Sequence, residues 1–427
     1  MVHDPVEYPG IRWSSPLSTL LPGHFALQDD YYTSHITLED ALSHRSGLPR
    51  HDLAYGWSED REPDALDIIQ TMRHLPLTAE PRTKWQYCNL MYGTVGQALA
   101  VLSGIDFGNV LKKLIWEPIG MRSTTISTKE AMATRDPHGK TRLSRGYFWN
   151  KDHYLPEPYV NLDPLAGAGA TISSVNDYAV WIQTLLNAGT NDSSPINEAI
   201  YNDLTGARTI MGGVFGTLQP IPLLYALGWH NIMAGTHEVI THSGSVTGFG
   251  ANVYIFPGEE IGLVSMANTM GSSNQAGALI FIEILKRLRK VSSVNDTVNL
   301  NSLHESLVSY PKAHQQSSSG SGNHHVLTGT ELSLPGHLAD YIGLYHHPAY
   351  GVFNVSAVDD KPNYHGEHAA GIQEPIMSTS PKSQLRIKPS DRTWPFEISL
   401  NHTSNTLFAT QIYVSSLFSS REDYKVD

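Results

Sequence analysis

The chain has 427 residues and one cysteine, Cys88, which excludes an intrachain disulfide and a cysteine-based metal cluster. Its formal net charge of −12 argues against a nucleic-acid partner, because a phosphate backbone is bound by basic side chains. No apolar run approaches the ~18 residues of a membrane span, and the N-terminus has neither the basic nor the apolar region of a secretory signal. We therefore expect a soluble, cytoplasmic protein of two or three domains.

Helix signals dominate the first third of the chain. Apolar side chains recur there at helical spacing, and Thr37 with Asp40 forms a capping-box pattern. Asp106 is a second expected N-cap. The predicted helices cover residues 37–42, 63–75, 89–102 and 106–116.

Strand signals follow after residue 230. Short runs rich in β-branched residues predict strands over 238–241, 251–256 and 261–266. The last two flank Pro257 and Gly258, a turn signal, so we expect them to form an antiparallel hairpin. A helix should return over 275–290, with Ile280 and Leu285 on its apolar face. Helices around an antiparallel sheet indicate the α+β class.

A stretch rich in serine and glycine, residues 311–330, indicates a flexible linker, because it cannot bury enough apolar surface to order itself. It separates residues 1–310, which carry the mixed helix and strand signals, from residues 331–427. Within the tail, runs such as Tyr341–Val358 and Leu407–Val414 alternate like strands and have no helical period. We expect a small all-β domain there.

Two short motifs, Tyr87-Cys88-Asn89 and His242-Ser243-Gly244, carry the strongest functional signal. The first follows a polar loop and opens a predicted helix, and the second ends a predicted strand. Three further segments accompany them in a fixed order along the chain: 42–49, 116–121 and 166–174. Over residues 10–290 this series resembles the serine β-lactamase-like family, in its group of class C β-lactamases, D-alanyl-D-alanine carboxypeptidases and esterases. The tail resembles the lipocalin-like β-barrel domain appended to many members of that group.

The resemblance implies an antiparallel sheet flanked by helices plus a helical subdomain, and acyl transfer through a serine ester with no cofactor or metal. It makes Tyr87 the proton-transfer group and Asn89 the amide that orients the substrate carbonyl. His242 becomes the strand-edge proton or charge partner, where β-lactamases have lysine. Gly244 would allow close backbone approach, and the Ser245 amide would donate to the oxyanion. Because a phenol has a pKa of about 10, Tyr87 can act as a base at neutral pH only beside cations.

The nucleophile motif of the family, Ser-x-x-Lys, is missing from its expected place. No lysine precedes Lys84, and the one match in the sequence, Ser309 to Lys312, follows the other motifs and contains Pro311, which opposes a regular helix. We therefore expect the chain as written to be inactive. In this family an N-terminal helix and strands complete the sheet, so we also expect an exposed sheet edge. A truncated gene product explains these features better than a degenerate family member, because the remaining motifs are intact.

Three functions stay open. The first is a serine hydrolase, either an esterase or a peptidase, that acts on a small-molecule ester, amide or peptide. The second is a non-catalytic family member that binds an acyl-like ligand. The third is an acyltransferase of small-molecule biosynthesis, in which an acyl acceptor replaces water. Metal chemistry is disfavoured because none of the 21 histidines lies in a His-Glu-x-x-His pattern, and the sequence does not indicate an oligomeric state.

Overall fold

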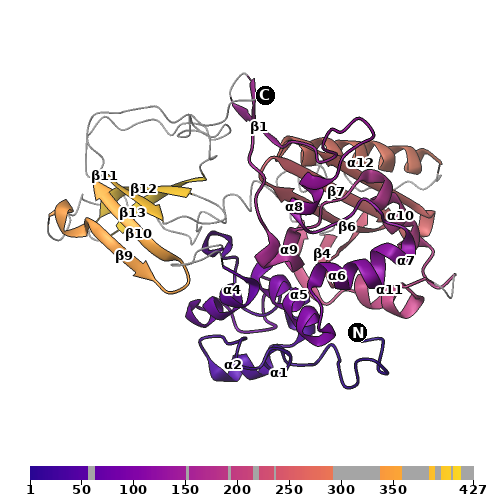
Figure 1. Cartoon of the computed structure of the whole chain (residues 1–427), viewed down its shortest axis with the longest axis horizontal. Coiled ribbons are helices and arrows are strands. Elements are labelled where there is room, and N and C mark those ends of the chain that lie inside the picture. Colours follow the sequence, from indigo (N-terminus) through magenta and orange to yellow (C-terminus); the bar gives the residue numbers. More distant parts are fainter. Residues whose placement is uncertain are drawn as a thin grey trace.

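An antiparallel sheet of six strands forms the centre of the first part of the chain (Figure 1). The strand order is β3-β4-β5-β6-β7-β8. Each strand pairs with the next in sequence, so the predicted hairpin across residues 257–260 is confirmed. The strands are β3 (Thr209–Val214), β4 (Ile221–Tyr225), β5 (His230–Ala234), β6 (His237–Val246), β7 (Phe249–Phe256) and β8 (Ile261–Ala267). The computed structural model describes residues 1–55, 63–150, 153–190, 194–214, 221–234, 237–291, 337–357, 384–389, 396–404 and 407–414.

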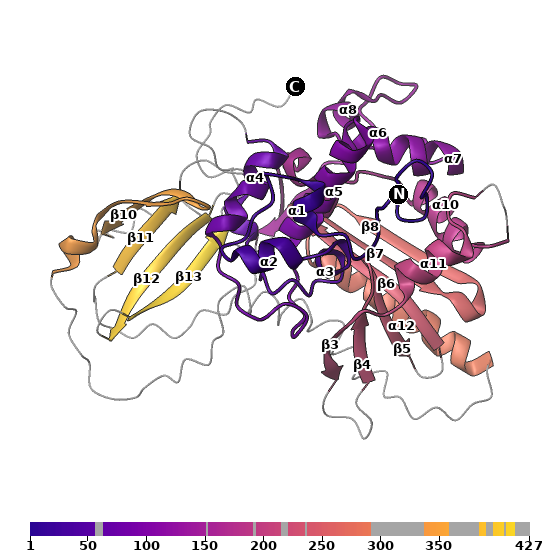
Figure 2. The same ribbon diagram turned by 90° about the horizontal axis from the view of Figure 1, so that it is seen from below.

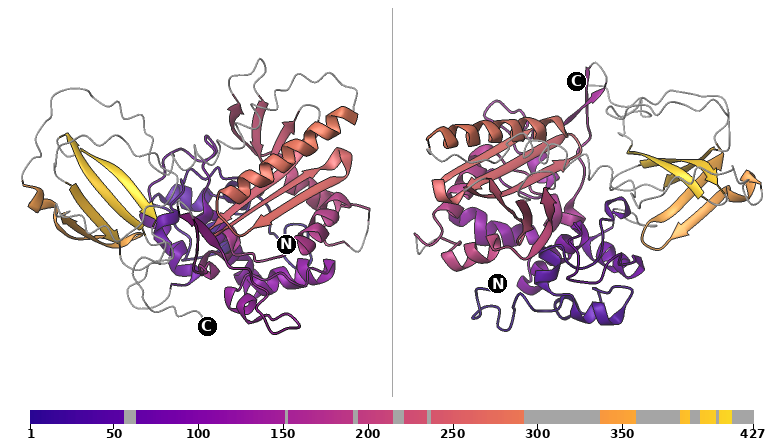
Figure 3. Two further views of the ribbon diagram at one scale, coloured as in Figure 1. Left: turned by 90° about the horizontal axis from the view of Figure 1, so that it is seen from above. Right: turned by 180° about the vertical axis from the view of Figure 1, so that it is seen from behind.

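Helix α12 (Ser272–Val291) covers one face of the sheet and lies along it in Figure 3, where it is drawn in salmon. Phe281 packs against Tyr254 and Phe256 of β7, and the ring centroids of Tyr254 and Phe281 are 4.1 Å apart. Leu285 is fully buried as predicted, whereas Ile280 is 50% exposed, so its expected place on the apolar face is wrong. The buried stripe runs through Phe281 and Leu285, and Ile280 is rotated from Phe281 by about 100° around the helix.

Helix α10 (Val175–Leu186) covers the opposite face of the sheet. Its Ile182 packs against Val253 and Ile255, which alternate along β7 with the side chains that face α12. The helix also approaches β8 closely, because a Cβ atom at Gly262 would lie 2.1 Å from the Ile182 side chain. Glycine at this position therefore allows the helix to pack on the sheet.

A group of short helices packs beside the sheet and around α5 (Asn89–Ser103). Leu90 and Met91 of α5 belong to a large apolar cluster that also takes in the N-terminal helices. The segment α9 (Ala166–Gly169) lies against this helix, and a Cβ atom at Gly167 would be 2.3 Å from the Tyr92 carbonyl oxygen. The remaining helices and the two-stranded ribbon are α1 (Leu17–Leu20), α2 (Asp30–His35), α3 (Leu38–Leu42), α4 (Ala65–Thr71), α6 (Phe107–Leu111), α7 (Glu117–Ile119), α8 (Thr128–Ala133), α11 (Glu198–Thr205), β1 (Tyr147–Asn150) and β2 (His153–Pro156).

The four helices predicted in the first third of the chain are present. The capping box is confirmed, because the Asp40 amide donates to Thr37 Oγ1 at 3.2 Å and the Thr37 amide donates to Asp40 Oδ2 at 3.1 Å. Asp106 caps α6 as expected, and a π-helical turn then continues the helix toward α7. Helix α4 begins two residues later than predicted, with Asp64 as its N-cap.

Ion pairs fasten the loop that follows α3. The completely buried Asp40 carboxylate accepts hydrogen bonds from Arg45 Nε and from Arg82 Nη2, both at 2.7 Å. Arg45 also pairs with Glu39 at 2.7 Å, and the second oxygen of Glu39 pairs with Arg208 Nε at 2.7 Å. One charge network therefore joins α3, the loop after it, the loop before α5 and the residue that precedes β3.

The tail forms a second antiparallel sheet, ordered β13-β12-β11-β10-β9. Within the described residues no pairing joins the outer strands β9 and β13, so closure into a barrel and the lipocalin-like resemblance stay predictions. The predicted linker, residues 311–330, lies outside the described residues. The strands are β9 (Gly343–His347), β10 (Gly351–Ala357), β11 (Gln384–Pro389), β12 (Phe396–Ser404) and β13 (Leu407–Val414).

The tail sheet lies beside the short helices of the first part, close to α4 (Figure 2). The turn between β9 and β10 makes the contact. Ala349 in this turn is 1% exposed and belongs to the apolar cluster around α5, and Tyr350 packs against the same cluster. Residues far apart in the sequence therefore share one core.

Candidate active site

The Tyr87-Cys88-Asn89 motif lies where a loop turns into α5, as predicted. Cys88 is the N-cap with an extended backbone, and Asn89 is the first helical residue. The Cys88 side chain makes no capping bond, but its backbone N–H donates to His44 Nδ1 at 3.0 Å. The buried His44 side chain therefore fixes the start of the helix, and with it the positions of Tyr87 and Asn89.

His242 lies inside a strand, not at its end, which corrects the prediction. Strand β6 continues for four residues beyond His242, so Gly244 and Ser245 are also paired with β7. Both are exposed, and neither makes a hydrogen bond to Tyr87 or Asn89 in the part of the chain that the structure describes. The ladder with β7 continues through Ser243, Gly244 and Ser245, which are not β-branched, so the β-branched run underestimates the length of the strand.

The structure brings Tyr87 and His242 together in one cluster of aromatic side chains. Their ring centroids are 6.4 Å apart. His44 lies between several rings of the cluster, 4.2 Å from the Tyr87 centroid and 4.9 Å from the Tyr225 centroid. The His230 ring lies 5.1 Å from that of His242. Side chains from separate loops and strands therefore converge in one cluster.

The Tyr87 phenol is protonated in this arrangement. Burial raises the pKa of Tyr87 to about 12, a neighbouring Arg50 lowers the pKa, and Asp52 raises it. The Arg50 guanidinium carbon lies 4.5 Å from the centroid of the Tyr87 ring, which is a cation–π contact. Arg50 is thus a cation of the kind that a phenol base requires, and further positive charge is needed to form the phenolate at neutral pH.

Asp52 links Arg50 to the other end of the motif. It forms an ion pair with Arg50, and its Oδ1 accepts a hydrogen bond from Asn89 Nδ2 at 3.1 Å. One short segment therefore contacts both the Tyr87 and the Asn89 side chains. Neither Arg50 nor Asp52 was predicted from the sequence, where the one signal for them is their place directly after the segment 42–49.

His242 is held as a neutral imidazole. Its Nδ1 lies 2.7 Å from the Ser243 carbonyl oxygen, which can only accept, so Nδ1 carries the proton. The unprotonated Nε2 then accepts from the Tyr225 hydroxyl at 3.2 Å. Burial lowers the pKa of His242 below its usual value, which favours the same neutral form. The ring nitrogen that faces Tyr225 is therefore a hydrogen-bond acceptor.

Cys88 is fully buried, and burial raises the pKa of its thiol to about 12, so a thiolate nucleophile is disfavoured. Within the described residues no group of three or more histidine, cysteine, aspartate or glutamate side chains could hold a metal ion. No helix among the described residues is long and apolar enough to cross a membrane.

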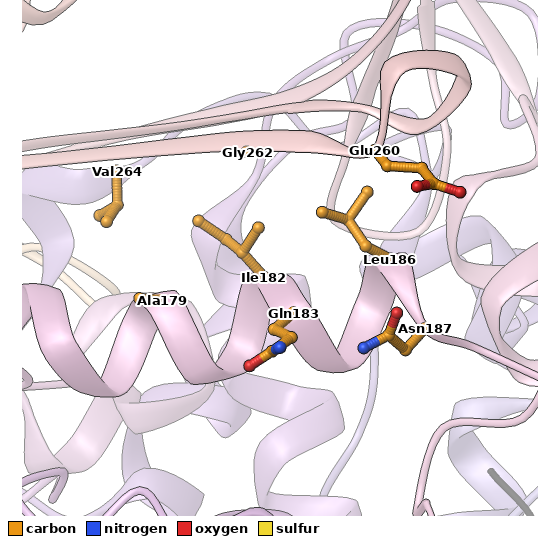
Figure 4. Close-up of a pocket in the computed structure, with 8 residues that line it drawn as sticks. All are labelled: Ala179, Ile182, Gln183, Leu186, Asn187, Glu260, Gly262 and Val264. Atoms are coloured by element: carbon orange, nitrogen blue, oxygen red, sulfur yellow. The ribbon is translucent and has the colours of Figure 1, made fainter. Parts of the chain in front are cut away.

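A pocket of about 400 Å³ lies between α10 and β8 (Figure 4). Ile182 and Leu186 point from the helix toward the strand, and Glu260 supplies the carboxylate of its lining. None of the candidate site residues lines this pocket. Its lining residues are Ala179, Ile182, Gln183, Leu186, Asn187, Glu260, Gly262 and Val264.

The fold and the cluster define a protein of the β-lactamase type, and comparison with known proteins agrees. The profile of the beta-lactamase family matches residues 1–284, so the chain belongs to the beta-lactamase family. The resemblance inferred from the motifs is thereby confirmed at the level of the family.

Two curated relatives are fungal hydrolases. The unguisins hydrolase ungD' of Aspergillus campestris is 38% identical over 294 residues, which are 67% of this chain and 53% of that protein. The unguisins hydrolase ungD of Aspergillus violaceofuscus is 30% identical over 379 residues, which are 84% of this chain and 66% of that protein. The chain thus spans about half to two thirds of the length of these relatives.

A solved structure supports the fold across both parts of the chain. The octameric penicillin-binding protein homologue from Pyrococcus abyssi superposes with a TM-score of 0.55 and 16% sequence identity. The match covers 93% of this chain and 75% of that chain. At this identity the likeness shows the β-lactamase and transpeptidase-like α+β fold alone.

Proposed function

We propose that this chain is part of a serine hydrolase that cleaves an amide or an ester through an acyl-serine intermediate. The observation that carries the proposal is the convergence of Tyr87 and His242, whose ring centroids are 6.4 Å apart although they come from different elements. Membership of the beta-lactamase family and the two relatives named hydrolases support the same reaction class.

In this proposal each candidate residue has one role. Tyr87 takes the proton of the serine nucleophile and returns it to the leaving group, and Arg50 favours its ionised form. Asn89, held by Asp52, presents its amide to the substrate carbonyl. His242, inside β6, accepts or relays a proton. Gly244 and Ser245 of β6 line the oxyanion side, where a backbone N–H stabilises the tetrahedral intermediate.

The nucleophile is proposed to come from a Ser-x-x-Lys segment that lies outside residues 1–427. Residues 1–427 alone should therefore hydrolyse little substrate. The sequence has no lysine ahead of Lys84, and within the described residues strand β8 has a free outer edge that a further strand could pair with. We further propose the division into a hydrolase domain (1–310), a linker (311–330) and a lipocalin-like β-barrel (331–427).

Sequencing of full-length transcripts tests the origin of the nucleophile. We expect an in-frame Ser-x-x-Lys ahead of residue 1, and we call the protein translated from such a transcript the restored form. In-frame stop codons directly above Met1 would instead favour a non-catalytic binding protein.

Hydrolysis assays test the reaction. Residues 1–427 should give no burst with nitrocefin or p-nitrophenyl acetate and no serine labelled by a fluorophosphonate, whereas the restored form should be labelled at one serine. An unguisin is the first natural substrate to test, because both relatives are named for it. A product formed with an added amine in place of water would assign the protein to the acyltransferases. A restored form that is neither labelled nor active would contradict the proposal.

A further inference from the structure

The proposed function leaves the tail sheet without a role, yet its β9–β10 turn contacts the first part of the chain. The Tyr350 hydroxyl lies 2.6 Å from His51 Nδ1, and the two rings meet edge to face with centroids 5.9 Å apart. Ala349 beside it is 1% exposed within the apolar cluster around α5. The turn is therefore fixed by both the packing of Ala349 and a hydrogen bond of Tyr350.

In the sequence, His51 lies between the two residues that contact the Tyr87-Cys88-Asn89 motif. Arg50 on one side lies over the Tyr87 ring, and Asp52 on the other accepts from the Asn89 amide at 3.1 Å. The three residues share one stretch of backbone, so a displacement of His51 must move its neighbours. Residues 50 and 51 lie outside regular secondary structure, and Asp52 begins a single 3₁₀ turn, so the backbone ladder of a helix or sheet does not hold them.

The His51 ring is suited to a packing contact of this kind. It is partly buried, and burial lowers its pKa to about 4, so the ring is neutral at pH 7. A neutral imidazole can share a hydrogen bond with the Tyr350 hydroxyl without placing a second cation beside Arg50. The contact therefore orders the segment and leaves the charge next to Tyr87 unchanged.

We propose that the β9–β10 turn of the tail sheet is a structural part of the active site, and that Tyr350 is a positioning residue which acts through His51 to hold Arg50 over Tyr87 and Asp52 at Asn89. The effect of Tyr350 on catalysis rests on the proposed function. The geometric claim stands on the contacts of His51 alone and can be tested without turnover.

The test uses residues 1–427 with ¹³C-labelled tyrosine, and the Tyr87 ring signal is assigned with the Tyr87→Phe variant. Removal of the hydroxyl in Tyr350→Phe should shift the Tyr87 signal in the same direction as Arg50→Lys, because both variants change the cation over the ring. Tyr345→Phe is the matched control. Tyr345 is in the same sheet, its hydroxyl donates to the Tyr341 carbonyl, and its loss should leave the Tyr87 signal in place.

The restored form adds a readout that a purely structural contact would not give. In Tyr350→Phe, kcat should fall roughly 3- to 30-fold with the melting temperature nearly unchanged, and the loss should become smaller in an Arg50→Lys background. A Tyr87 signal that moves in Arg50→Lys but stays fixed in Tyr350→Phe would overturn the inference. That outcome is independent of whether Tyr87 is catalytic, which the turnover of Tyr87→Phe decides.

Discussion

Replacement of Asp40 by asparagine should lower the melting temperature by about 4–6 °C. The carboxylate is completely buried and accepts hydrogen bonds from Arg45 Nε and Arg82 Nη2, both at 2.7 Å, and from the Thr37 hydroxyl at 2.9 Å. Asparagine keeps the shape but loses the charge and one acceptor oxygen. Breaking a buried ion pair costs about 3–5 kcal/mol; since Arg82 is half exposed and can be rehydrated, we take about 3 kcal/mol. For a domain of about 300 residues each kcal/mol is worth about 1.5 °C, because the entropy of unfolding is about 2.1 cal/mol/K per residue near 60 °C.

Calorimetry at pH 7 measures the effect, with Asp30→Asn as the control. Asp30 is exposed in the first turn of α2, so its replacement should cost no more than about 0.5 kcal/mol. Because Asp40 fastens the loop that carries His44, the variant should also lose the order of the site before the sheet unfolds. An Asp40→Asn protein that melts within about 2 °C of the wild type would refute the reasoning.

The Asp40 carboxylate also makes the stability of the protein depend on pH. Burial raises the pKa of Asp40, but the hydrogen bonds from Arg82 and Arg45 outweigh burial and leave this pKa below its usual value. A carboxyl group whose pKa is depressed on folding adds stability above its unfolded pKa of about 3.9, and this stability is lost as the pH falls through the folded pKa. The difference in melting temperature between wild type and Asp40→Asn should therefore shrink below about pH 4.

Two further predictions concern the site. In the restored form, the acid limb of the pH profile of kcat/KM should lie below about pH 6.5, because burial lowers the pKa of His242. The substitution His242→Ala should remove this limb. A limb that persists in His242→Ala would exclude this residue as its source. Cys88, which is buried and has a thiol pKa of about 12, should react with a thiol reagent such as Ellman's reagent only after unfolding in guanidinium. Fast reaction of the native protein would contradict the burial of Cys88.

Features encoded by neighbouring residues were predictable from the sequence. The capping box of Thr37 and Asp40, the start of α5 at Asn89 and the hairpin across residues 257–260 each depend on contacts within a few positions. The position of Ile280 was predicted wrongly, because the apolar residues of this helix fit more than one buried face at helical spacing. The packing of Phe281 on β7 selects one of these faces.

Contacts between distant segments could not be predicted. Arg50 reaches the Tyr87 ring by means of a long side chain, and no spacing rule encodes that reach. The hydrogen bond of His51 with Tyr350 joins residues 299 positions apart, so it depends on how the tail sheet docks. The motif order predicted that Tyr87 and His242 share a site, whereas the cation beside the phenol became visible only in three dimensions.

The most direct test of the central claim is the turnover of Tyr87→Phe in the restored form, measured together with its melting temperature. The substitution removes the hydroxyl and keeps the ring over which Arg50 lies. If Tyr87 moves the proton of the serine, kcat should fall by roughly 10²–10⁴-fold, while KM and the melting temperature change little. If Tyr87 is a structural phenol at a helix start, its loss should cost about 1 kcal/mol of stability and leave turnover intact. A Tyr87→Phe enzyme that melts earlier yet turns over at the wild-type rate would contradict the account.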